Sequence, residues 1–347
     1  MAAIEKKSNK FEEIAKHLAD STILITGASG MMGQNIVRIL TQMNDEMNAD
    51  IKIVAHARSL EKAEKVFAEY TSRSDFQMYI SDIVNFDFDG DVDYIIHTAG
   101  VTGGSKQHVD FPMRTISVAL DGTRRVLDVA LSKKAKGVVY LSSLEAYGNT
   151  GVDKTEIFET DGGYIDPVNV RSSYSESKRM CECMCASYTK QYGLPTYIAR
   201  LTATFGYGVA YNDNRVFAQF ARSIIEKNDI VLKSTGETVR NYCDAEDAAM
   251  ALLLMFVNGV PGEAYNVANM NAEISIKDLA EKFITLFPES NISLKFDLGD
   301  DAAKLGYIAV MRNVINSEKL MSIGWEPVYS MDEMIIRLVN SLKKEEN

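Results

Sequence analysis

The stretch STILITGASGMMG, residues 21–33, joins a β-branched apolar run to three glycines with GxxGxxG spacing. Residues 21–27 predict a buried strand, and helical spacing of apolar residues begins at Met31. Gly27, Gly30 and Gly33 allow a tight turn and a close approach of the backbone to a pyrophosphate, which would rest on the free N–H groups at the start of the helix. The strand–turn–helix context therefore predicts a dinucleotide-binding turn.

Strands and helices alternate after this turn. Apolar runs predict further strands at 51–58, 76–82, 92–100, 137–143 and 195–206. Helical patterns lie between them at 59–71, near 112–133, and in the segment that carries Tyr174 and ends near Tyr192. This alternation predicts a parallel sheet covered by helices on both faces, which is the doubly wound Rossmann type of α/β fold.

The pattern loosens after about residue 206. Helical segments near 215–227, 244–257, 275–287 and 330–343 are mixed with short strands such as 263–267. We expect a smaller mixed C-terminal lobe that closes over the carboxyl edge of the sheet. The expected organisation is an extension helix at 1–20, a Rossmann dinucleotide-binding domain at 21–206 with returning segments from the C-terminal half, and a mainly substrate-binding lobe at 207–347.

The composition indicates a chain with a sizeable core. Hydrophobic residues make up 46% and charged residues 24% of the 347 residues, and the formal net charge is -11 with no strongly basic block. This charge disfavours nucleic acid and anionic membranes as partners. The first 20 residues lack the apolar region of a signal peptide, and no apolar run is long enough to span a bilayer. A cytoplasmic protein is therefore the default expectation.

Cysteines and histidines give no sign of a metal site. Cys181 and Cys185 share one face of a helical pattern and Cys183 does not, so we interpret them as packing residues rather than zinc ligands. Of the four histidines, His97 ends a buried strand and is interpreted as structural. No serine elbow and no Cys/His pair with a clear third partner is present, and no metal is expected.

The second predicted strand should end in an acid if it is to hold the 2′-hydroxyl of an adenosine ribose. It ends in AHARS, where Arg58 stands instead of a carboxylate. An arginine can pair with a 2′-phosphate, so NADP is slightly favoured over NAD, although Arg58 could equally stack on adenine or face solvent. Asp82, at the end of the third strand, could accept from the adenine amino group or simply cap a helix.

Proton-transfer chemistry is suggested by the segment RSSYSESKRM, residues 171–180. As a helix, it puts Tyr174 and Lys178 one turn apart on the same face. Ser143 and Glu145 follow the strand at 137–143, at the carboxyl edge where ligands bind in α/β folds. We expect Tyr174 to take a proton from a substrate hydroxyl, Lys178 to lower its pKa and hold the nicotinamide ribose, and Ser143 to bond the same oxygen.

These motifs together resemble the extended short-chain dehydrogenases/reductases of the NAD-dependent epimerase/dehydratase family. The resemblance is carried by TGASGMMG, SDI at Asp82, HTAG, LSSLEAYG, YSESK, RNYCDAEDAA and NSEKLMSIGWEP, and extends from Thr22 to about Met334. Members of this family act on sugars carried by nucleoside diphosphates. They oxidise the sugar C4 hydroxyl to a ketone, carry out a reaction that the ketone permits, and usually return the hydride.

The resemblance implies roles for individual residues. The implied catalytic residues are Ser143, Tyr174, Lys178 and Glu145. The implied cofactor-binding residues are Gly27, Ser29, Gly30, Met31, Met32, Gly33, Arg58, Asp82, Ile83, Thr98, Ala99, Gly100, Tyr174 and Lys178. The implied substrate-binding residues are Thr102, Ser143, Thr202, Thr204, Arg215 and Arg240. Arg240 matches the arginine with which the family grips the substrate diphosphate.

The resemblance leaves the reaction open. Leu144 replaces the aspartate of 4,6-dehydratases, which argues against dehydration, whereas Glu145 and Arg171 resemble the pattern of UDP-glucuronate decarboxylases. Ala203 replaces the usual substrate-binding asparagine, with Thr202 and Thr204 as possible substitutes, and the second-strand acid of the decarboxylases is missing. A C4 epimerase fits nearly as well, and a net NADP-dependent reductase of a keto-sugar or sugar phosphate is the alternative.

The resemblance also implies a homodimer. Related enzymes dimerise through the helix that carries Tyr174 and the helix near 112–133. Met180, Met184 and the segment SVALDGTRRVLDVAL give both helices an apolar face. Such faces could equally pack within one subunit.

Overall fold

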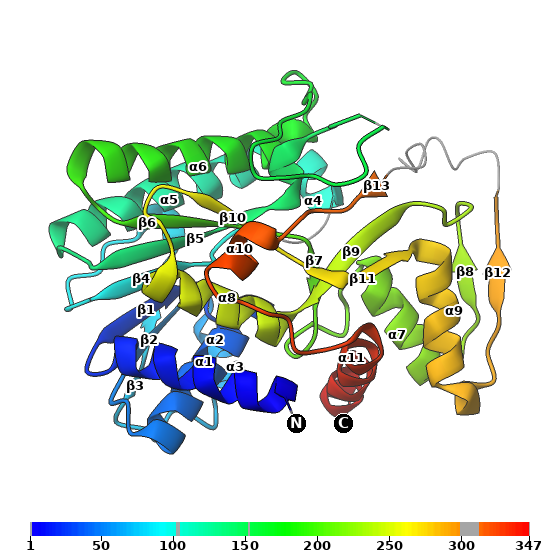
Figure 1. Cartoon of the computed structure of the whole chain (residues 1–347), viewed down its shortest axis with the longest axis horizontal. Helices are drawn as coiled ribbons and strands as arrows, with labels where there is room; N and C mark the ends of the chain where they lie inside the picture. The colour runs from blue at the N-terminus through cyan, green and yellow to red at the C-terminus, as the bar shows by residue number, and fades with distance from the viewer. Residues whose placement is uncertain (1, 102–104, 152, 299–311, 347) are drawn as a thin grey trace.

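A computed structural model describes residues 2–101, 105–151, 153–298 and 312–346 (Figure 1). Its centre is a seven-stranded sheet in the order β10-β6-β5-β4-β1-β2-β3, and every pair of neighbouring strands is parallel. The strands are β1 (Thr22–Thr26), β2 (Lys52–Ala57), β3 (Phe76–Ile80), β4 (Tyr94–His97), β5 (Gly137–Ser143), β6 (Thr196–Leu201) and β10 (Ala264–Val267). The strand order reverses between β1 and β4, which is where ligands bind in such sheets. The predicted doubly wound α/β fold is confirmed.

Helices cover both faces of this sheet (Figure 1). On one face lie α2 (Met31–Met47) and α8 (Ala245–Asn258), and on the other lie α5 (Pro112–Ser132) and α6 (Ser172–Tyr192). The expected N-terminal helix is α1 (Ala2–Leu18), which packs on α2 and α8 through buried side chains such as Phe11, Ile14 and Leu18. The helix expected at 59–71 is shorter, α3 (Leu60–Val66), because the chain turns at Phe67 and packs that ring against Phe76.

The strand expected at 195–206 is divided in two. Residues 196–201 form β6 of the main sheet, whereas β7 (Ala203–Phe205) leaves it and pairs with β9 (Val239–Asp244). Thr202 lies at the break and donates its hydroxyl to Asn241 O at 2.7 Å. The chain therefore crosses from the main sheet to a second layer at Thr202. The strand before this residue belongs to the main sheet, and the strand after it belongs to the second layer.

The second layer holds a small mixed sheet and its own core. Strand β9 pairs with β7, with β11 (Asn269–Ser275) and with β13 (Arg312–Asn313), while β8 (Ile230–Leu232) pairs with β12 (Leu294–Phe296). The packed helices are α7 (Val216–Glu226), α9 (Ile276–Leu286) and α11 (Met331–Glu346). Shorter helical segments elsewhere are η1 (Ile83–Asn85), α4 (Ser105–Asp110), η2 (Leu144–Tyr147), η3 (Pro288–Ser290) and α10 (Glu318–Ser322).

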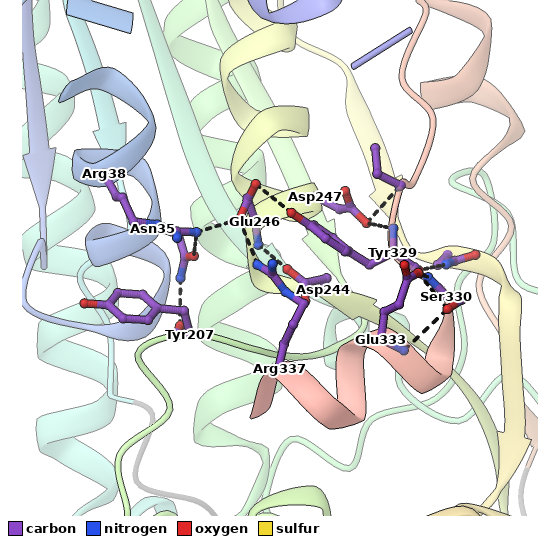
Figure 2. A network of polar contacts seen from close by, with 12 residues as sticks. Asn35, Arg38, Tyr207, Asp244, Glu246, Asp247, Tyr329, Ser330, Glu333 and Arg337 are labelled. Atoms are coloured by element: carbon purple, nitrogen blue, oxygen red, sulfur yellow. Dashed lines mark hydrogen bonds and ion pairs between the residues drawn. The ribbon is translucent and has the colours of Figure 1, made fainter. Parts of the chain in front are cut away.

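A polar network joins the two layers (Figure 2). Glu246, in the first turn of α8, accepts from Arg38 of α2 at 2.5 Å and from Arg337 of α11 at 2.8 Å, and Tyr329 donates to its other oxygen at 2.9 Å. Asp244 caps α8 by accepting from the amide of Glu246 at 2.8 Å. The helix that begins at the glycine turn is thus linked to the last helix of the chain through Glu246 of α8.

Candidate active site

The turn between β1 and α2 has the geometry that the glycine spacing predicts. Gly27 has a φ of 67°, and a Cβ placed there would lie 2.7 Å from Ala99 Cα. A Cβ on Gly33 would lie 2.4 Å from Ala28 Cα, so only glycine lets α2 pack this closely on the turn. Gly30 caps α2 without a side-chain hydrogen bond, and the first helical turn has no acidic residue. The free N–H groups and the positive helix end therefore fit a pyrophosphate.

The end of β4 lies directly beside this turn. Thr98 Oγ1 donates to Thr26 O at 2.7 Å, and Ala99 N donates to Thr26 Oγ1 at 3.3 Å. Gly100 follows in an exposed position. The predicted residues Ser29, Met31 and Met32 belong to the turn and to the start of α2. The structure thus brings these parts of the predicted cofactor set to one edge of the sheet, while Thr102 lies outside the described residues.

His56 supports the glycine turn from below, a role that sequence reasoning missed. Its carbonyl accepts from Ala28 N at 2.9 Å, and its Nδ1 accepts from Gly27 N at 3.4 Å. Burial lowers the pKa of His56 to about 4, so the ring is neutral at physiological pH. Its Nε2 contacts Ser81 O at 3.0 Å, and a donor there leaves Nδ1 as the acceptor. The only signal in the sequence was its place at the end of the second strand.

Asp82 has the capping role that was one of its two predicted interpretations. Its carboxylate accepts from Val84 N at 3.2 Å at the start of η1 and from Arg114 at 2.7 Å. Burial raises the pKa of Asp82, but the bonds from Arg114 and Val84 N outweigh it and the pKa is lowered. Ile83 beside it is buried. Arg58 is exposed at the end of β2, and its charge also stabilises the Asp82 carboxylate. Two arginines therefore lie near the position expected for the adenosine.

Ser143, Tyr174 and Lys178 converge at the carboxyl end of β5. Ser143 is the last residue of that strand, and Tyr174 lies in the first turn of α6, within hydrogen-bonding reach of the Ser143 hydroxyl. Lys178 is buried and donates from Nζ to Leu141 O at 2.6 Å. The Nζ atom lies 4.8 Å from the centre of the Tyr140 ring and 5.7 Å from that of Tyr174. The predicted helical face is present at the predicted edge.

The pKa of Tyr174 differs from the expectation. Burial, and then the charge of Glu145, raise the pKa of Tyr174 to about 12. The Ser143 hydroxyl, Arg171 and Arg215 act against this rise. Lys178 was expected to lower the pKa, but it donates to a carbonyl of β5 and lies over another ring, and burial lowers its own pKa. In the protein alone, the arginines are therefore the main cations that favour the phenolate.

Glu145 is held by two residues close to Tyr174 in the sequence, Arg171 and Ser175. Arg171 Nη2 donates to both carboxylate oxygens at 2.8 Å, and Ser175 Oγ donates to one of them at 3.2 Å. The side chains of Glu145 and Arg171 are 38% and 32% exposed, so the pair is open to a ligand. Sequence reasoning found Glu145 and noted Arg171, but it did not find the pairing, which joins η2 to the start of α6.

His108 was also missed as a site residue. It is buried, and its ring stacks on that of Tyr174 with centroids 4.5 Å apart and an angle of 28° between the planes. Its Nδ1 contacts Thr115 Oγ1 at 3.2 Å. Because α4 precedes Tyr174 by a long stretch of chain, no local pattern in the sequence could have indicated this stack.

Four of the predicted substrate residues divide into two threonines and two arginines. Thr202 donates to Asn241 O at 2.7 Å and Thr204 donates to Thr202 O at 3.0 Å, and both are buried, so neither proton is available to a sugar. Arg215 is paired with Asp213 through Nη2 at 2.6 Å. The Nε atom of Arg240 is buried and has no hydrogen-bond partner among the described residues. An orphaned guanidinium donor is costly, so this arginine is suited to an anionic ligand.

The structural interpretations of the histidine and the cysteines are consistent with the structure. His97 is buried between Thr26 Oγ1 at 2.6 Å and Thr123 Oγ1 at 3.1 Å, and burial lowers its pKa to about 3. Cys181 and Cys185 are buried, whereas Cys183 is exposed. Within the described part of the chain, no cluster of three or more His, Cys, Asp or Glu side chains could hold a metal ion. No helix of that same part has the length and apolar character needed to cross a membrane.

Comparison with known proteins gives one family over most of the chain. Residues 23–268 match the model of the NAD dependent epimerase/dehydratase family. A dTDP-D-glucose 4,6-dehydratase of Mus musculus is 25% identical over 333 residues, which cover 93% of this chain and 88% of the relative. A UDP-glucuronic acid decarboxylase 1 of Xenopus tropicalis is 26% identical over 325 residues, covering 93% of this chain and 72% of that protein.

A solved structure shares the fold. The UDP-glucuronic acid 4-epimerase of Bacillus cereus, determined in complex with NAD, superimposes with a TM-score of 0.76 over 94% of this chain and 100% of the epimerase. Its sequence is 17% identical, so it supports the shared fold alone. The matched relatives thus include a dehydratase and a decarboxylase, and the solved structure is an epimerase.

Proposed function

The chain belongs to the NAD-dependent epimerase/dehydratase family, and on this basis we propose that it oxidises the C4 hydroxyl of a nucleoside-diphosphate sugar and then returns the hydride. The observation that carries the proposal is the convergence of Ser143, Tyr174 and Lys178 at the carboxyl edge of the sheet that also holds the glycine turn. A phenol, a hydroxyl and an ammonium at one edge of the sheet make a proton-transfer set, and nothing in the packing of β5 against α6 requires these three types together.

Each residue has a separate task in this proposal. Tyr174 Oη takes the proton of the sugar hydroxyl, and Ser143 Oγ donates to the same oxygen as it becomes a carbonyl. Lys178, whose Nζ is anchored on Leu141 O, holds the nicotinamide ribose. When bound, the nicotinamide supplies the hydride acceptor that protein side chains lack. Burial raises the pKa of the phenol, whereas a base must be ionised to take a proton. The charges of Arg171 and Arg215 lower this pKa and so favour the ionised form.

The diphosphate of the substrate is assigned to Arg240. Its buried Nε is an unused donor, and arginine binds phosphate oxygens with two parallel hydrogen bonds. Arg215 is the second candidate, but Asp213 already accepts from its Nε and Nη2 atoms. Arg240→Ala should therefore weaken binding of the nucleotide sugar, while a loss of cofactor binding instead would contradict the assignment.

For the cofactor we propose a preference for NADP over NAD. The support is the exposed Arg58, which stands at the end of β2 in the place of the carboxylate that would bind a 2′-hydroxyl. A second arginine, Arg114, lies nearby and donates to Asp82. Arg58→Ala should weaken NADP about tenfold to a hundredfold, as expected for lost charged hydrogen bonds, and leave NAD nearly unchanged. Lys62→Ala, an exposed cation on α3, is the control. Equal losses for both cofactors would mean that Arg58 meets no 2′-phosphate.

The reaction served by the ketone is either decarboxylation or C4 epimerisation. Leu144 in place of an acid disfavours loss of water. Decarboxylation is supported by Glu145, whose two carboxylate oxygens both accept from Arg171 at the site. A C4 ketone makes a C5 carboxylate a β-keto acid, from which CO2 leaves easily. Glu145→Gln should cripple a decarboxylase and spare most of an epimerase, because an epimerase needs only the Ser/Tyr/Lys set and room for the keto sugar to turn over.

The deciding experiment is product analysis. The purified full-length chain is incubated with UDP-glucuronate, UDP-glucose and UDP-N-acetylglucosamine, with NAD and NADP supplied separately, and Tyr174→Phe serves as the control. Mass spectrometry detects the loss of one CO2, and chromatography detects an epimer of unchanged mass. Stoichiometric consumption of NADPH with a keto-sugar, without conversion of any nucleotide sugar, would reject the proposal in favour of a reductase.

We also propose a homodimer formed through the outer faces of α5 and α6. The inner faces are used within one subunit, since Val118, Val126 and Leu127 of α5 belong to the core above the sheet. Met180 of α6 is 52% exposed and supports an intersubunit contact, while Asp121 and Asp128 on the outer side of α5 make that contact partly polar. Analytical ultracentrifugation that detects only monomer would remove the idea.

A further inference from the structure

We infer that His108 is a positioning residue for Tyr174: its imidazole lies flat on the phenol, fixes the direction of the hydroxyl and shields the ring from water. The stack joins α4 to α6, with ring centroids 4.5 Å apart and planes 28° from parallel. The significance of the stack rests on the proposed function, in which Tyr174 is the base. The existence of the stack does not depend on it.

His108 is itself held from two sides. Its carbonyl accepts from Ser173 Oγ at 3.3 Å, so the residue directly before Tyr174 in α6 is tied to it. Its ring contacts Thr115 Oγ1 of α5 at 3.2 Å, and Thr115 Oγ1 donates to Phe111 O at 3.4 Å. Because that hydroxyl proton is used, the hydroxyl accepts from the ring, and the proton of neutral His108 lies on Nδ1. Three helices therefore fix the plane on which the phenol rests.

The surroundings lower the pKa of His108 and so disfavour the charged form of the ring. Burial comes first in lowering the pKa of His108, the charges of Arg171 and Lys178 lower it further, and Glu145 alone raises it. Arg171 lies at the N-cap of α6, Lys178 lies in α6 and Glu145 lies in η2, and the Tyr174 ring faces the imidazole from α6. A neutral imidazole covers the phenol without stabilising the phenolate, in keeping with the burial that raises the pKa of Tyr174 to about 12. Ring orientation and shielding are therefore the contributions expected of His108.

The first test measures ionisation of the phenol and needs no substrate. Tyrosinate absorbance is recorded at about pH 10.5, where a phenol of pKa near 12 stays protonated and an ordinary phenol is mostly ionised. Each His108 variant is compared with the same variant carrying Tyr174→Phe, so that the difference reports Tyr174 alone. We expect His108→Ala to raise this signal and His108→Phe, which keeps a flat ring, to leave it low. No rise in His108→Ala would overturn the shielding.

The second test separates positioning from general packing. A loosened base should lower kcat about tenfold to a hundredfold in His108→Ala and leave the KM of the cofactor unchanged. His108→Phe should recover most of this loss. If His108→Phe is as impaired as His108→Ala while its phenol stays shielded, the flat ring is not what matters and the inference fails.

Two further variants serve as controls for the role of His108. His17→Ala removes a histidine beside Tyr94, with ring centroids 6.0 Å apart, and should change neither measurement. Should His108→Ala fail to fold, His108→Leu fills the space without a flat ring, and a wild-type kcat in that variant would overturn the inference. If the wild-type chain converts no nucleotide sugar, the proposed function fails by itself, and the ionisation difference still decides whether His108 covers Tyr174.

Discussion

Two glutamates in this protein are paired with arginines, and they differ in what surrounds them. Glu246 is 11% exposed and accepts from Arg38 of α2 and from Arg337 and Tyr329 of the C-terminal segment, far apart in the sequence (Figure 2). Glu145 is 38% exposed and accepts from Arg171 and Ser175, both at the start of one helix. The first carboxylate joins helices of two layers, and the second stands open beside Tyr174.

Two properties distinguish an ion pair that stabilises the fold from one that could take part in the reaction. They are the burial of the carboxylate and the elements from which its donors come. A buried carboxylate is tolerated when donors occupy its lone pairs, and removal of one partner is then expensive. An exposed pair contributes little to stability, so stability alone is a weak reason for Glu145 and Arg171 to be paired at the site. Three experiments test this division between Glu246 and Glu145, and a fourth, with the largest expected effect, tests Tyr174 as the base beside Glu145.

The largest effect is expected at Tyr174. Tyr174→Phe should lower turnover of the nucleotide sugar by about a hundredfold to ten-thousandfold, the usual contribution of a general base, while the affinity for the cofactor stays nearly intact. The free energy of unfolding should change little, because the ring and its stack on His108 are kept. Steady-state kinetics, cofactor titration and urea denaturation measure the three quantities. Surviving turnover would show that the base lies elsewhere.

The second effect concerns Glu246 and is one of stability. Glu246→Ala leaves Arg38 and Arg337 without a shared partner, so the free energy of unfolding should fall by about 3 kcal/mol, the low end for broken buried pairs because both arginines are partly exposed. Urea denaturation provides the measurement. Glu246→Gln, which keeps the acceptor for Tyr329, should lose less. A stability equal to wild type in Glu246→Ala would mean that the network does not hold the layers together.

Local features of the sequence determined what could be predicted. The strands of the main sheet and the glycine turn follow from apolar runs and from glycines that act within a few residues. The one-turn separation of Tyr174 and Lys178 follows from helix geometry alone. Helix geometry does not predict the direction in which the Lys178 side chain points, because its acceptor, Leu141 O, lies in β5.

Contacts between distant segments account for the errors. The break at Thr202 depends on Asn241, far along the chain, and the apolar run at 195–206 contains no sign of it. His108 meets Tyr174 only because α4 packs beside α6, and Glu145 is recognised as a held carboxylate only when Arg171 is seen across from it. A motif therefore identifies the residues of a site but not the partners that set their pKa values.

A third prediction concerns the charge of Glu145 rather than its chemistry. That charge raises the pKa of Tyr174, so Glu145→Gln should lower it. A base acts when deprotonated, and activity rises as the pH increases through its pKa. The rising limb of the pH–rate profile for the oxidation step should therefore move to lower pH in Glu145→Gln. Glu246→Gln, remote from the phenol, should leave the limb in place. A shift to higher pH would contradict the assigned sign.

The smallest effect is expected for the stability that the Glu145–Arg171 pair contributes. A double-mutant cycle with Glu145→Ala, Arg171→Ala and the double variant should give a coupling energy of about 0.5 kcal/mol, typical of exposed pairs, because water already solvates a third of each side chain. Urea denaturation of the four proteins measures it. A coupling energy above about 2 kcal/mol would place this pair with Glu246 among the architectural contacts. The open position of Glu145 beside Tyr174 would then be a consequence of packing, and the case for Glu145 as a reacting group would rest on the product analysis alone.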